Sequence, residues 1–317
     1  MYRLTANDRR FRIFLELKRG ISGEEIARKY GLSRTAIWKF VRRLEEMGYV
    51  FESRRGVGYR IVHSPDLSVF EIASVCFKSD LVEEVFYYEE VDSTNQRARE
   101  VGKPKRLFIA ERQTRGRGRY GRVWVSDPGG LYFSITLPRE IPLEDLPKIT
   151  LTSGLAVARA LNARLKWPND VMMMGRKLCG ILCEISGEIE NPLVIVGIGI
   201  NVNNKTPEGG ISLREVEGKE LRRIDVFRSV FESFEVYYKR LIKREWEEIR
   251  KEWIENSDTI GKRVVVRVAG KEYRGIAVDL DEDGGLILKE DEKTIRIFSG
   301  GCFYVTPSAG LKPRLSQ

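Results

Sequence analysis

The positive charge of this 317-residue chain is concentrated in its first 65 residues, and this distribution constrains the architecture more than any other feature of the sequence. The segment contains 15 Lys and Arg against 7 Asp and Glu, whereas the remaining residues contain 40 and 39. A basic segment on a nearly neutral body is typical of a separate nucleic-acid-binding domain. The length also predicts two or three domains rather than one.

The basic segment has the pattern of three helices followed by a β-hairpin. Thr5–Asp8 can begin the first helix, and Ser22–Glu25 can begin a short second helix as a capping box. Ser33 begins a third helix that we expect to end at Gly48. The residues expected in the core of this segment are Phe11, Phe14, Leu15, Ile37, Val41 and Leu44.

A short helix, a tight turn at Gly31 and a longer helix together predict a helix-turn-helix. Strands at 49–52 and 58–61 flank a basic tip, which predicts a wing that can reach phosphates or the minor groove. A module that binds another protein is the alternative, and Trp38 could contact DNA or pack under the wing. The residues expected to contact DNA are Ser33, Arg34, Thr35, Trp38, Lys39, Arg42, Arg54 and Arg55.

Composition excludes several classes of protein. No apolar run reaches the length of about 18 residues that a membrane helix needs, and the charged N-terminus does not resemble a secretion signal. Four scattered cysteines do not suit a disulfide framework, which favours a reducing cytoplasm. The single histidine, His63, argues against a Ser-His-Asp triad and a multi-histidine zinc site, and we expect no side-chain cluster for a metal.

The body of the chain changes pattern twice. From residue 81 strands alternate with helices, and from residue 260 the pattern is entirely β, as in a small barrel. We expect strands at 85–89, 107–111, 130–138, 177–186 and 193–199, a helix at 149–162, and a helical region at 225–258 with a break near Lys243.

The segment Gln113–Arg122 (QTRGRGRYGR) carries four arginines and three glycines. Its backbone N–H groups can approach an anion closely, and its guanidinium groups can bind phosphate through paired hydrogen bonds. An RNA-binding patch and a solvated loop are the alternatives that this segment leaves open when it is taken alone.

Four further motifs carry groups that could surround a ligand. Lys166–Asp170 (KWPND) places two polar groups after a rigid Trp-Pro step, with a plain turn as the alternative. Gly175–Leu182 (GRKLCGIL) places Lys177 in an apolar strand, where it could stabilise developing phosphate charge or lie at a surface edge. Gly197–Asn201 (GIGIN) allows close approach of a ligand or another strand. Asp92–Asn95 (DSTN) could hold a polar ligand or cap a helix.

Together and in this order, the five motifs resemble those of the bifunctional biotin–[acetyl-CoA-carboxylase] ligase and biotin operon repressor family. The resemblance covers essentially the whole chain. It implies an α+β, multidomain fold with an N-terminal winged helix-turn-helix, a central mixed-sheet α/β ligase domain similar to class II synthetases, and a C-terminal SH3-like β-barrel. We expect these domains at 1–64, 81–258 and 259–317, with a linker that contains a short helix at 65–80.

The resemblance implies a two-step reaction. Biotin and ATP, with Mg²⁺, give biotinyl-5′-AMP and pyrophosphate, and a lysine of a biotin carboxyl carrier protein then takes the biotin and releases AMP. The residues implied to be catalytic are Lys177, Arg119 and Asp170. The implied biotin-binding residues are Ser93, Thr94, Asn95, Gln113, Arg117, Gly118, Arg119 and Lys177. The implied ATP- and adenylate-binding residues are Arg117, Arg119, Arg122, Asn169, Lys177 and Asn201.

The chain departs from the family pattern at two positions. Tyr120 stands where the best-known bacterial members have arginine, and we expect it to change the stiffness of the loop. Thr306 stands where the family's barrel has a nucleotide-facing arginine, so the sequence leaves open how the barrel helps to hold ATP.

The resemblance also implies regulation by biotinyl-5′-AMP. The adenylate is expected to order the loops and to favour a homodimer, in which two sheets pair edge to edge and two winged helices bind a palindromic operator. The expected partners are therefore the carrier protein, double-stranded operator DNA and a second copy, with no membrane, in the cytoplasm. The alternatives are a DNA-binding biotin sensor without ligase activity, a lipoate-type acyl ligase of the related fold, and a ligase whose N-terminal module docks proteins.

Overall fold

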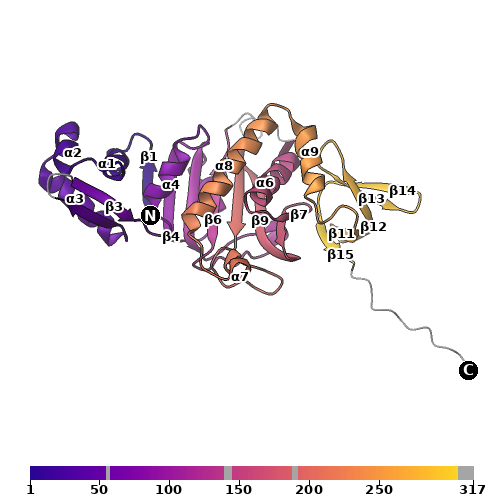
Figure 1. Cartoon of the computed structure of the whole chain (residues 1–317). Helices are drawn as coiled ribbons and strands as arrows, with labels where there is room; N and C mark the ends of the chain where they lie inside the picture. Colours follow the sequence, from indigo (N-terminus) through magenta and orange to yellow (C-terminus); the bar gives the residue numbers. More distant parts are fainter. Residues whose placement is uncertain (55–57, 139–144, 188–191, 306–317) are drawn as a thin grey trace, which may run out of the picture.

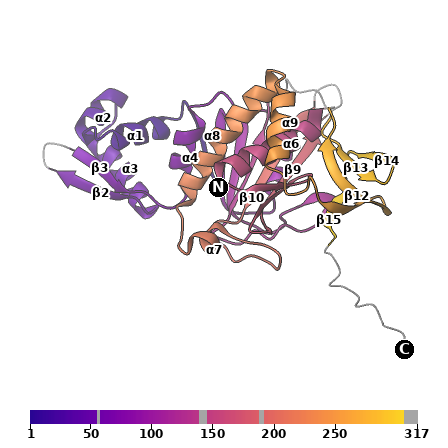
Figure 2. The same ribbon diagram turned by 45° about the vertical axis from the view of Figure 1, so that its right-hand side comes forward.

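The computed structural model describes residues 1–54, 58–138, 145–187 and 192–305. Three parts lie in a row: an N-terminal helical module, a central sheet covered by helices, and a C-terminal barrel (Figures 1 and 2). Among the helices of these residues, none is both long enough and apolar enough to cross a membrane.

The N-terminal module is a helix-turn-helix with a hairpin wing, as predicted. Ser22 accepts a hydrogen bond from the Glu25 N–H, Ser33 accepts one from the Ala36 N–H, and Gly31 ends the second helix in the left-handed conformation with φ 59°. The helices are α1 (Arg9–Lys18), α2 (Gly23–Tyr30) and α3 (Arg34–Glu46), and the wing strands are β2 (Val50–Arg54) and β3 (Gly58–His63).

The core of this module includes Ile13 and Leu17, which the prediction omitted, and leaves Leu15 at its edge. Leu15 is only partly buried, because it lies beyond the arc of α1 that the buried side chains occupy at 100° per residue. The buried core side chains of α1 and α3 are Phe11, Ile13, Phe14, Leu17, Ile37, Val41 and Leu44.

The central sheet has eight strands in the order β1-β4-β5-β6-β10-β9-β8-β7. Strands β4 and β5 pair in parallel, and the other described neighbours pair antiparallel, so the sheet is mixed as expected. The strands are β1 (Tyr2–Thr5), β4 (Glu84–Val91), β5 (Arg106–Gln113), β6 (Leu131–Thr136), β7 (Arg164–Lys166), β8 (Asp170–Met173), β9 (Arg176–Ser186) and β10 (Leu193–Ile200).

Both faces of the central sheet are covered, and alternate strand residues supply the two cores. On β5, Leu107 and Ile109 join the main core, whereas Phe108 and Ala110 join a smaller core that includes Ala98 of α5. Helices α6, α8 and α9 cover the main face (Figure 1). The helices of this part are α4 (Val69–Cys76), α5 (Thr94–Val101), α6 (Leu146–Ala160), α7 (Leu213–Glu217), α8 (Arg223–Ile242) and α9 (Trp246–Glu255).

The first strand of the chain belongs to the central sheet. Residues 2–5 pair antiparallel with β4, with Tyr2 opposite Tyr87 and Thr5 opposite Glu84. The first helix starts only after these residues, with Asp8 as its N-cap. The winged-helix module and the central sheet therefore share a strand that helix-start signals alone did not predict.

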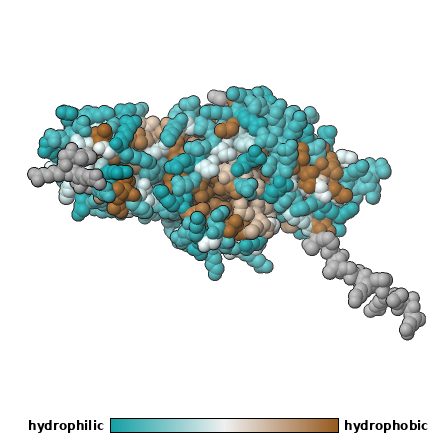
Figure 3. Space-filling view, viewed as in Figure 1, coloured by the Kyte–Doolittle hydropathy of each residue, from teal (hydrophilic) through white to brown (hydrophobic). Residues whose placement is uncertain are grey.

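The segment 65–80, which we expected to be a linker with a short helix, contains α4. Seven of the eight residues of this helix are buried, and α4 packs against α1, β1, β4 and α8. The segment therefore forms part of the core between the N-terminal module and the sheet. The surface visible in Figure 3 is largely hydrophilic, with hydrophobic side chains showing on the N-terminal module, in the middle of the molecule and on the barrel.

The C-terminal barrel consists of one antiparallel sheet in the order β14-β13-β12-β11-β15, as the SH3-like prediction requires. Its turn at 281–285 contacts the central domain, because the Trp167 indole N–H donates to the Gly284 carbonyl at 3.3 Å. The strands are β11 (Arg263–Val268), β12 (Lys271–Leu280), β13 (Leu286–Glu290), β14 (Lys293–Ile297) and β15 (Gly301–Tyr304).

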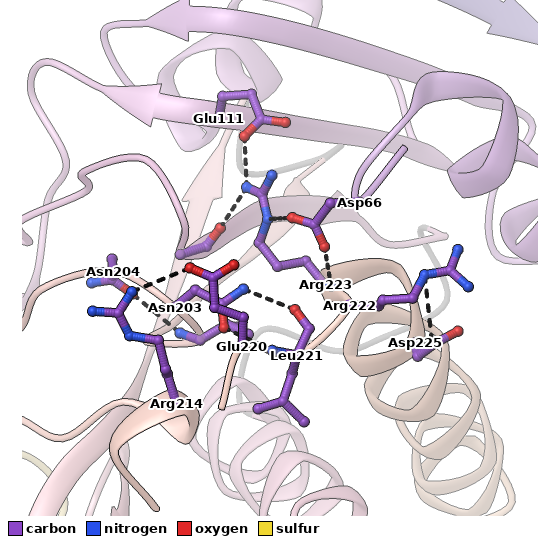
Figure 4. Close-up of polar contacts among 12 residues, drawn as sticks. Asp66, Glu111, Asn203, Asn204, Arg214, Glu220, Leu221, Arg222, Arg223 and Asp225 are labelled. Atoms are coloured by element: carbon purple, nitrogen blue, oxygen red, sulfur yellow. Dashed lines mark hydrogen bonds and ion pairs between the residues drawn. The ribbon is translucent and has the colours of Figure 1, made fainter. Parts of the chain in front are cut away.

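A buried guanidinium joins the segment that follows the winged-helix module to the central domain (Figure 4). The Arg223 side chain, at the start of α8, is 9% exposed and forms ion pairs with Asp66 and with Glu111, the latter at 2.6 Å. It also donates to the Gly130 carbonyl at 3.1 Å. Asp66 follows the wing, and Glu111 lies on β5 and accepts from the Tyr87 hydroxyl at 2.6 Å. One side chain therefore connects three separate segments of the chain.

We predict that Arg223→Met lowers the free energy of unfolding by about 3 kcal/mol, because it leaves the Glu111 carboxylate without its buried partner. Arg222→Met is the matched control, since the exposed Arg222 contacts Asp225 only at 4.0 Å, and it should change stability by less than about 0.5 kcal/mol. Urea denaturation measures both values, and equal losses for the two variants would contradict the prediction.

Candidate ligand-binding site

A cavity of about 190 Å³ lies where the central sheet meets the barrel. Most of the predicted site residues line it, although they come from distant parts of the chain. Those lining residues are Ser93, Thr94, Asn95, Gln113, Arg117, Gly118, Arg119, Arg122, Asn169, Asp170 and Lys177.

Neutral polar groups form one part of the cavity wall. Gln113 Oε1 accepts from the Thr94 backbone N–H at 2.8 Å and from the Thr94 hydroxyl at 3.1 Å. The Ser134 hydroxyl lies 2.7 Å from Thr94 Oγ1 and 2.6 Å from Asn95 Oδ1. Asn95 also donates to Glu184 at 2.7 Å. This network fixes the directions of donors and acceptors before a ligand binds.

The DSTN motif also caps a helix, as its capping interpretation predicted, and its role in holding a ligand stays a prediction. Ser93 is the N-cap of α5, and its hydroxyl accepts from the Gln96 N–H. The Arg97 guanidinium hydrogen-bonds to Asp92 and thereby lowers the pKa of that carboxyl. The cap places Ser93, Thr94 and Asn95 at the start of the helix, where they face the sheet.

The arginine- and glycine-rich segment forms a compact hairpin beside the cavity. Gly118 donates to the Arg122 carbonyl at 2.7 Å, and Trp124 donates to the Gly116 carbonyl at 2.9 Å. At its tip Tyr120 adopts a left-handed conformation, with φ 56°. The Arg119 guanidinium lies 5.1 Å from the centre of the Tyr120 ring.

The glycines of the GIGIN strand are required by neighbouring side chains. A Cβ atom on Gly197 would lie 2.3 Å from Asn95 Oδ1, and one on Gly199 would lie 2.5 Å from Trp124 Nε1. Because real Cβ atoms do not approach this closely, only glycine lets Asn95 and Trp124 reach the strand. The close approach predicted for this motif is therefore an approach of side chains that line the cavity.

Lys177 points into the cavity rather than lying at a surface edge. Its ammonium group forms an ion pair with Asp170 at 2.6 Å and lies 5.3 Å from the Trp124 ring centre. Among the lining residues, Asp170 is the single carboxylate, whereas the cations are Arg117, Arg119, Arg122, Lys166 and Lys177. This excess of positive charge suits a ligand with several negative charges.

The thiol that lines the cavity is not a nucleophile at neutral pH. Burial raises the pKa of Cys302 to about 11, so the thiol keeps its proton. In the part of the chain that the structure describes, no group of three or more His, Cys, Asp or Glu side chains could hold a metal ion.

Asn201 is the one predicted ligand-site residue that does not line the cavity. It is 3% exposed, and it lies behind Lys177, where its amide nitrogen is 3.4 Å from the Lys177 carbonyl. Its Oδ1 accepts from Asn204 at 3.0 Å. Asn201 thus contacts the strand that carries Lys177. Thr306 lies outside the described residues.

The predicted DNA-contacting residues of α3 share one exposed face. Trp38 is 50% exposed, with the Arg42 guanidinium 5.7 Å from its ring centre, so Trp38 is not packed under the wing. Arg54 is the last residue of β2, and Arg55 lies outside the described residues. The predicted DNA-contacting residues on α3 and at its cap are all exposed: Ser33, Arg34, Thr35, Trp38, Lys39 and Arg42.

Sequence reasoning assigned no site role to three lining residues, Trp124, Lys166 and Phe303. Lys166 begins the KWPND motif and Trp124 follows the arginine- and glycine-rich segment by two residues, so closeness to these motifs was an available signal. Phe303 lies on β15 of the barrel, and nothing in its local sequence indicates that this strand meets the cavity.

The fold and the cavity define a class of protein: a winged helix joined to a ligase-type sheet with a cation-rich cavity and a terminal barrel. Family models agree with each part. The HTH domain model matches residues 9–60, the biotin/lipoate A/B protein ligase family model matches 87–201, and the biotin protein ligase C-terminal domain model matches 259–305.

Known proteins resemble the chain along most of its length. It is 32% identical to the bifunctional ligase/repressor BirA of Bacillus spizizenii, over 88% of this chain and 92% of that protein, and 30% identical to BirA of Escherichia coli, over 85% and 88%. The biotin protein ligase of Aquifex aeolicus in complex with biotin and ATP is 34% identical, with a TM-score of 0.63 over 70% of this chain and 99% of that one. The chain belongs to the family of bifunctional biotin–protein ligases and repressors.

Proposed function

We propose that the chain joins biotin to a carrier protein at the expense of ATP and represses transcription when its adenylate intermediate accumulates. The observation that supports this most directly is the cavity itself, in which a neutral hydrogen-bonding wall adjoins a wall of five cations. Biotin has a neutral ureido ring and a carboxylate, and ATP supplies the negative charge that the cations match.

Biotin binds along the neutral wall in this proposal. Ser93, Thr94 and Gln113 match the donors and acceptors of the ureido ring, and Asn95 supports them through its bond to Glu184. The Trp124 ring lines the cavity 5.3 Å from the Lys177 ammonium group and supplies apolar surface for the rest of the ligand. Arg117, Gly118 and Arg119 surround the biotin carboxylate.

Lys177 lies where the carboxylate meets the α-phosphate. A carboxylate oxygen attacks phosphorus, the bond between the α- and β-phosphates breaks, and pyrophosphate leaves with the electron pair. Lys177 offsets the charge that develops, and Asp170 at 2.6 Å holds its ammonium group in place. Arg119, Arg122 and Asn169 contact the phosphates, Asn201 supports the Lys177 strand from behind, and Mg²⁺ arrives with ATP.

The arginine-rich hairpin closes over the adenylate in this proposal. Its backbone bonds already bring Gly118 and Arg119 to the cavity, so closure needs only a local movement. Exclusion of water protects the mixed anhydride from hydrolysis until the carrier lysine arrives. Asp170 then orients that lysine, whose amine attacks the acyl carbon and releases AMP.

Repression uses the exposed face of α3 and a second copy of the chain. Strand β8 pairs with β9 only as far as Gly180, so within the described residues the outer side of β9 from 182 to 186 has no strand partner. An unpaired strand edge can pair with the same edge of a second copy about a two-fold axis. Such a homodimer presents two α3 helices to operator DNA. Because its proposed partners are DNA and the carrier protein, we expect the protein to act in the cytoplasm.

A biotinylation assay tests the ligase. We expect the protein to label a biotin carboxyl carrier domain when ATP, Mg²⁺ and biotin are present. Lipoate in place of biotin should give no product, which separates the proposal from a lipoate-type ligase. Product with lipoate alone would indicate the lipoate-type ligase, and absence of product with either acid would leave the DNA-binding biotin sensor.

A gel-shift titration tests repression. The protein should bind duplexes from biotin-gene promoters more tightly with biotinyl-5′-AMP than without it, and binding should weaken as salt rises because phosphate contacts release counterions. If the adenylate changes neither the affinity nor the dimer fraction, the N-terminal module serves another role, such as protein docking.

We predict that Lys177→Ala slows adenylate formation at least about tenfold, the scale expected when one contact to transition-state charge is lost. Biotin-dependent pyrophosphate release measures this rate. Lys103→Ala, at an exposed position that does not line the cavity, should keep the original rate. Equal rates for the two variants would refute the role of Lys177.

We predict that Arg119→Gly releases biotinyl-5′-AMP before transfer, because the hairpin loses the side chain that lies against Asn169. The released adenylate should label bystander lysines on an added non-carrier protein. Arg115→Gly is the matched control, since Arg115 lies in the same hairpin but does not line the cavity. Labelling that stays restricted to the carrier would argue against the closing role of the hairpin.

A further inference from the structure

Two neighbouring aromatic residues of the barrel lie beneath cations of the cavity. The Lys166 ammonium nitrogen is 4.6 Å from the centre of the Tyr304 ring, and the Arg122 guanidinium carbon is 5.9 Å from the centre of the Phe303 ring. Lys166 and Arg122 belong to the central domain and line the cavity. Phe303 and Tyr304 end β15. The cations of one domain therefore contact the rings of another.

The same two rings each contact a second cation, which belongs to the barrel. Lys262 lies 4.4 Å from the Tyr304 ring centre, and Arg267 lies 5.0 Å from the Phe303 ring centre. The face of an aromatic ring attracts a cation within about 6 Å. Each ring thus contacts one cavity cation and one barrel cation. The adjacent residues Phe303 and Tyr304 therefore make the same pair of contacts.

The barrel is fixed to the segment that carries Lys166. The Trp167 backbone N–H donates to the Thr259 hydroxyl at 3.0 Å, and the Trp167 indole donates to the Gly284 carbonyl at 3.3 Å. Trp167 is 1% exposed and Thr259 is fully buried. Because these bonds join the residue next to Lys166 to the barrel on two sides, the Tyr304 ring keeps a constant position relative to Lys166.

A ring holds a cation without using its hydrogen-bond donors. A carboxylate partner would occupy the N–H groups of Lys166 and Arg122, whereas a ring face leaves them free for phosphate oxygens. A ring also restricts a long flexible side chain before the ligand arrives, so less rotamer freedom is lost on binding. Free N–H donors and a restricted side chain suit a site that binds a highly charged phosphate group and then releases it.

We propose that Phe303 and Tyr304 are positioning residues that hold Arg122 and Lys166 against the β- and γ-phosphates of ATP. The inference rests on the proposed function, in which Lys177 contacts the α-phosphate of ATP. The negative charge of the β- and γ-phosphates then requires further cations. Arg122 and Lys166 are the cavity cations in contact with the barrel rings. The barrel therefore contributes to the nucleotide site through two aromatic side chains that steer cations of the neighbouring domain.

Steady-state kinetics with the full chain test this inference. Tyr304→Leu and Phe303→Leu should each raise the KM for ATP about threefold to tenfold, the range expected when one cation–ring contact is lost, and should leave the KM for biotin unchanged. Tyr304→Phe, which keeps the ring, should restore the original KM for ATP. Phe303 is 36% exposed, so its replacement does not endanger folding.

Two further readouts separate positioning from a general loss of structure. Inhibition by pyrophosphate should weaken by the same factor as ATP binding, whereas inhibition by AMP should not change, because AMP lacks the outer phosphates. Transfer from preformed biotinyl-5′-AMP to the carrier domain should also keep its rate. Tyr273→Leu, on β12 of the same barrel and outside the cavity lining, is the control and should change none of these values.

Each outcome bears on the inference. A KM for ATP within twofold of the original in both leucine variants would overturn it. Equal rises in the KM values for ATP and biotin, or an equal effect of Tyr273→Leu, would assign the rings a purely structural role and also overturn it. Absence of biotin-dependent pyrophosphate release by the unaltered protein would instead overturn the proposed function on which the inference rests.

Discussion

Five cationic side chains line one cavity, and the need to offset their mutual repulsion shapes the structure around it. Asp170 is paired with Lys177, and aromatic rings accompany most of the cations. Lys177 lies over Trp124, Arg119 over Tyr120, Arg122 over Phe303 and Lys166 over Tyr304. Tyr120 and Trp124 belong to the hairpin and the residues that follow it, whereas Phe303 and Tyr304 belong to the barrel. The barrel therefore supplies two of the four rings that contact cations of the cavity.

The three parts of the chain are joined by different kinds of contact. At one end, the buried Arg223 guanidinium links Asp66 beyond the wing to Glu111 on β5. Glu111 lies two residues before Gln113, so the connection to the winged helix lies close to the neutral wall of the cavity. At the other end, Trp167 links the barrel to the segment that carries Asn169 and Asp170. Both neighbouring domains therefore contact the backbone that presents ligand-site residues.

Much of this architecture could be predicted from sequence, and the exceptions have physical causes. Caps predicted α2 and α3, and periodicity predicted the buried Ile37, Val41 and Leu44 of α3, because these signals act over one or two turns. The strand Tyr2–Thr5 was missed, since its pairing with β4 depends on residues about 80 positions away. The same limit applies to the site. The motifs supplied Lys177 and the arginine hairpin, whereas the position of Phe303 at the cavity depends on how two domains meet, which no local pattern records.

Because β1 belongs to the central sheet, truncation of the N-terminal module also removes an edge strand of that sheet. Removal of the first 65 or so residues to obtain a shorter ligase takes away Arg3, which pairs with the buried Glu84, and uncovers the hydrogen-bonding groups of β4. A bare strand margin of this kind invites association with other chains. A fragment that begins after the winged helix would therefore be prone to aggregate. A stable shortened enzyme would need a polar segment that covers the exposed edge of β4, or a charged substitution along it.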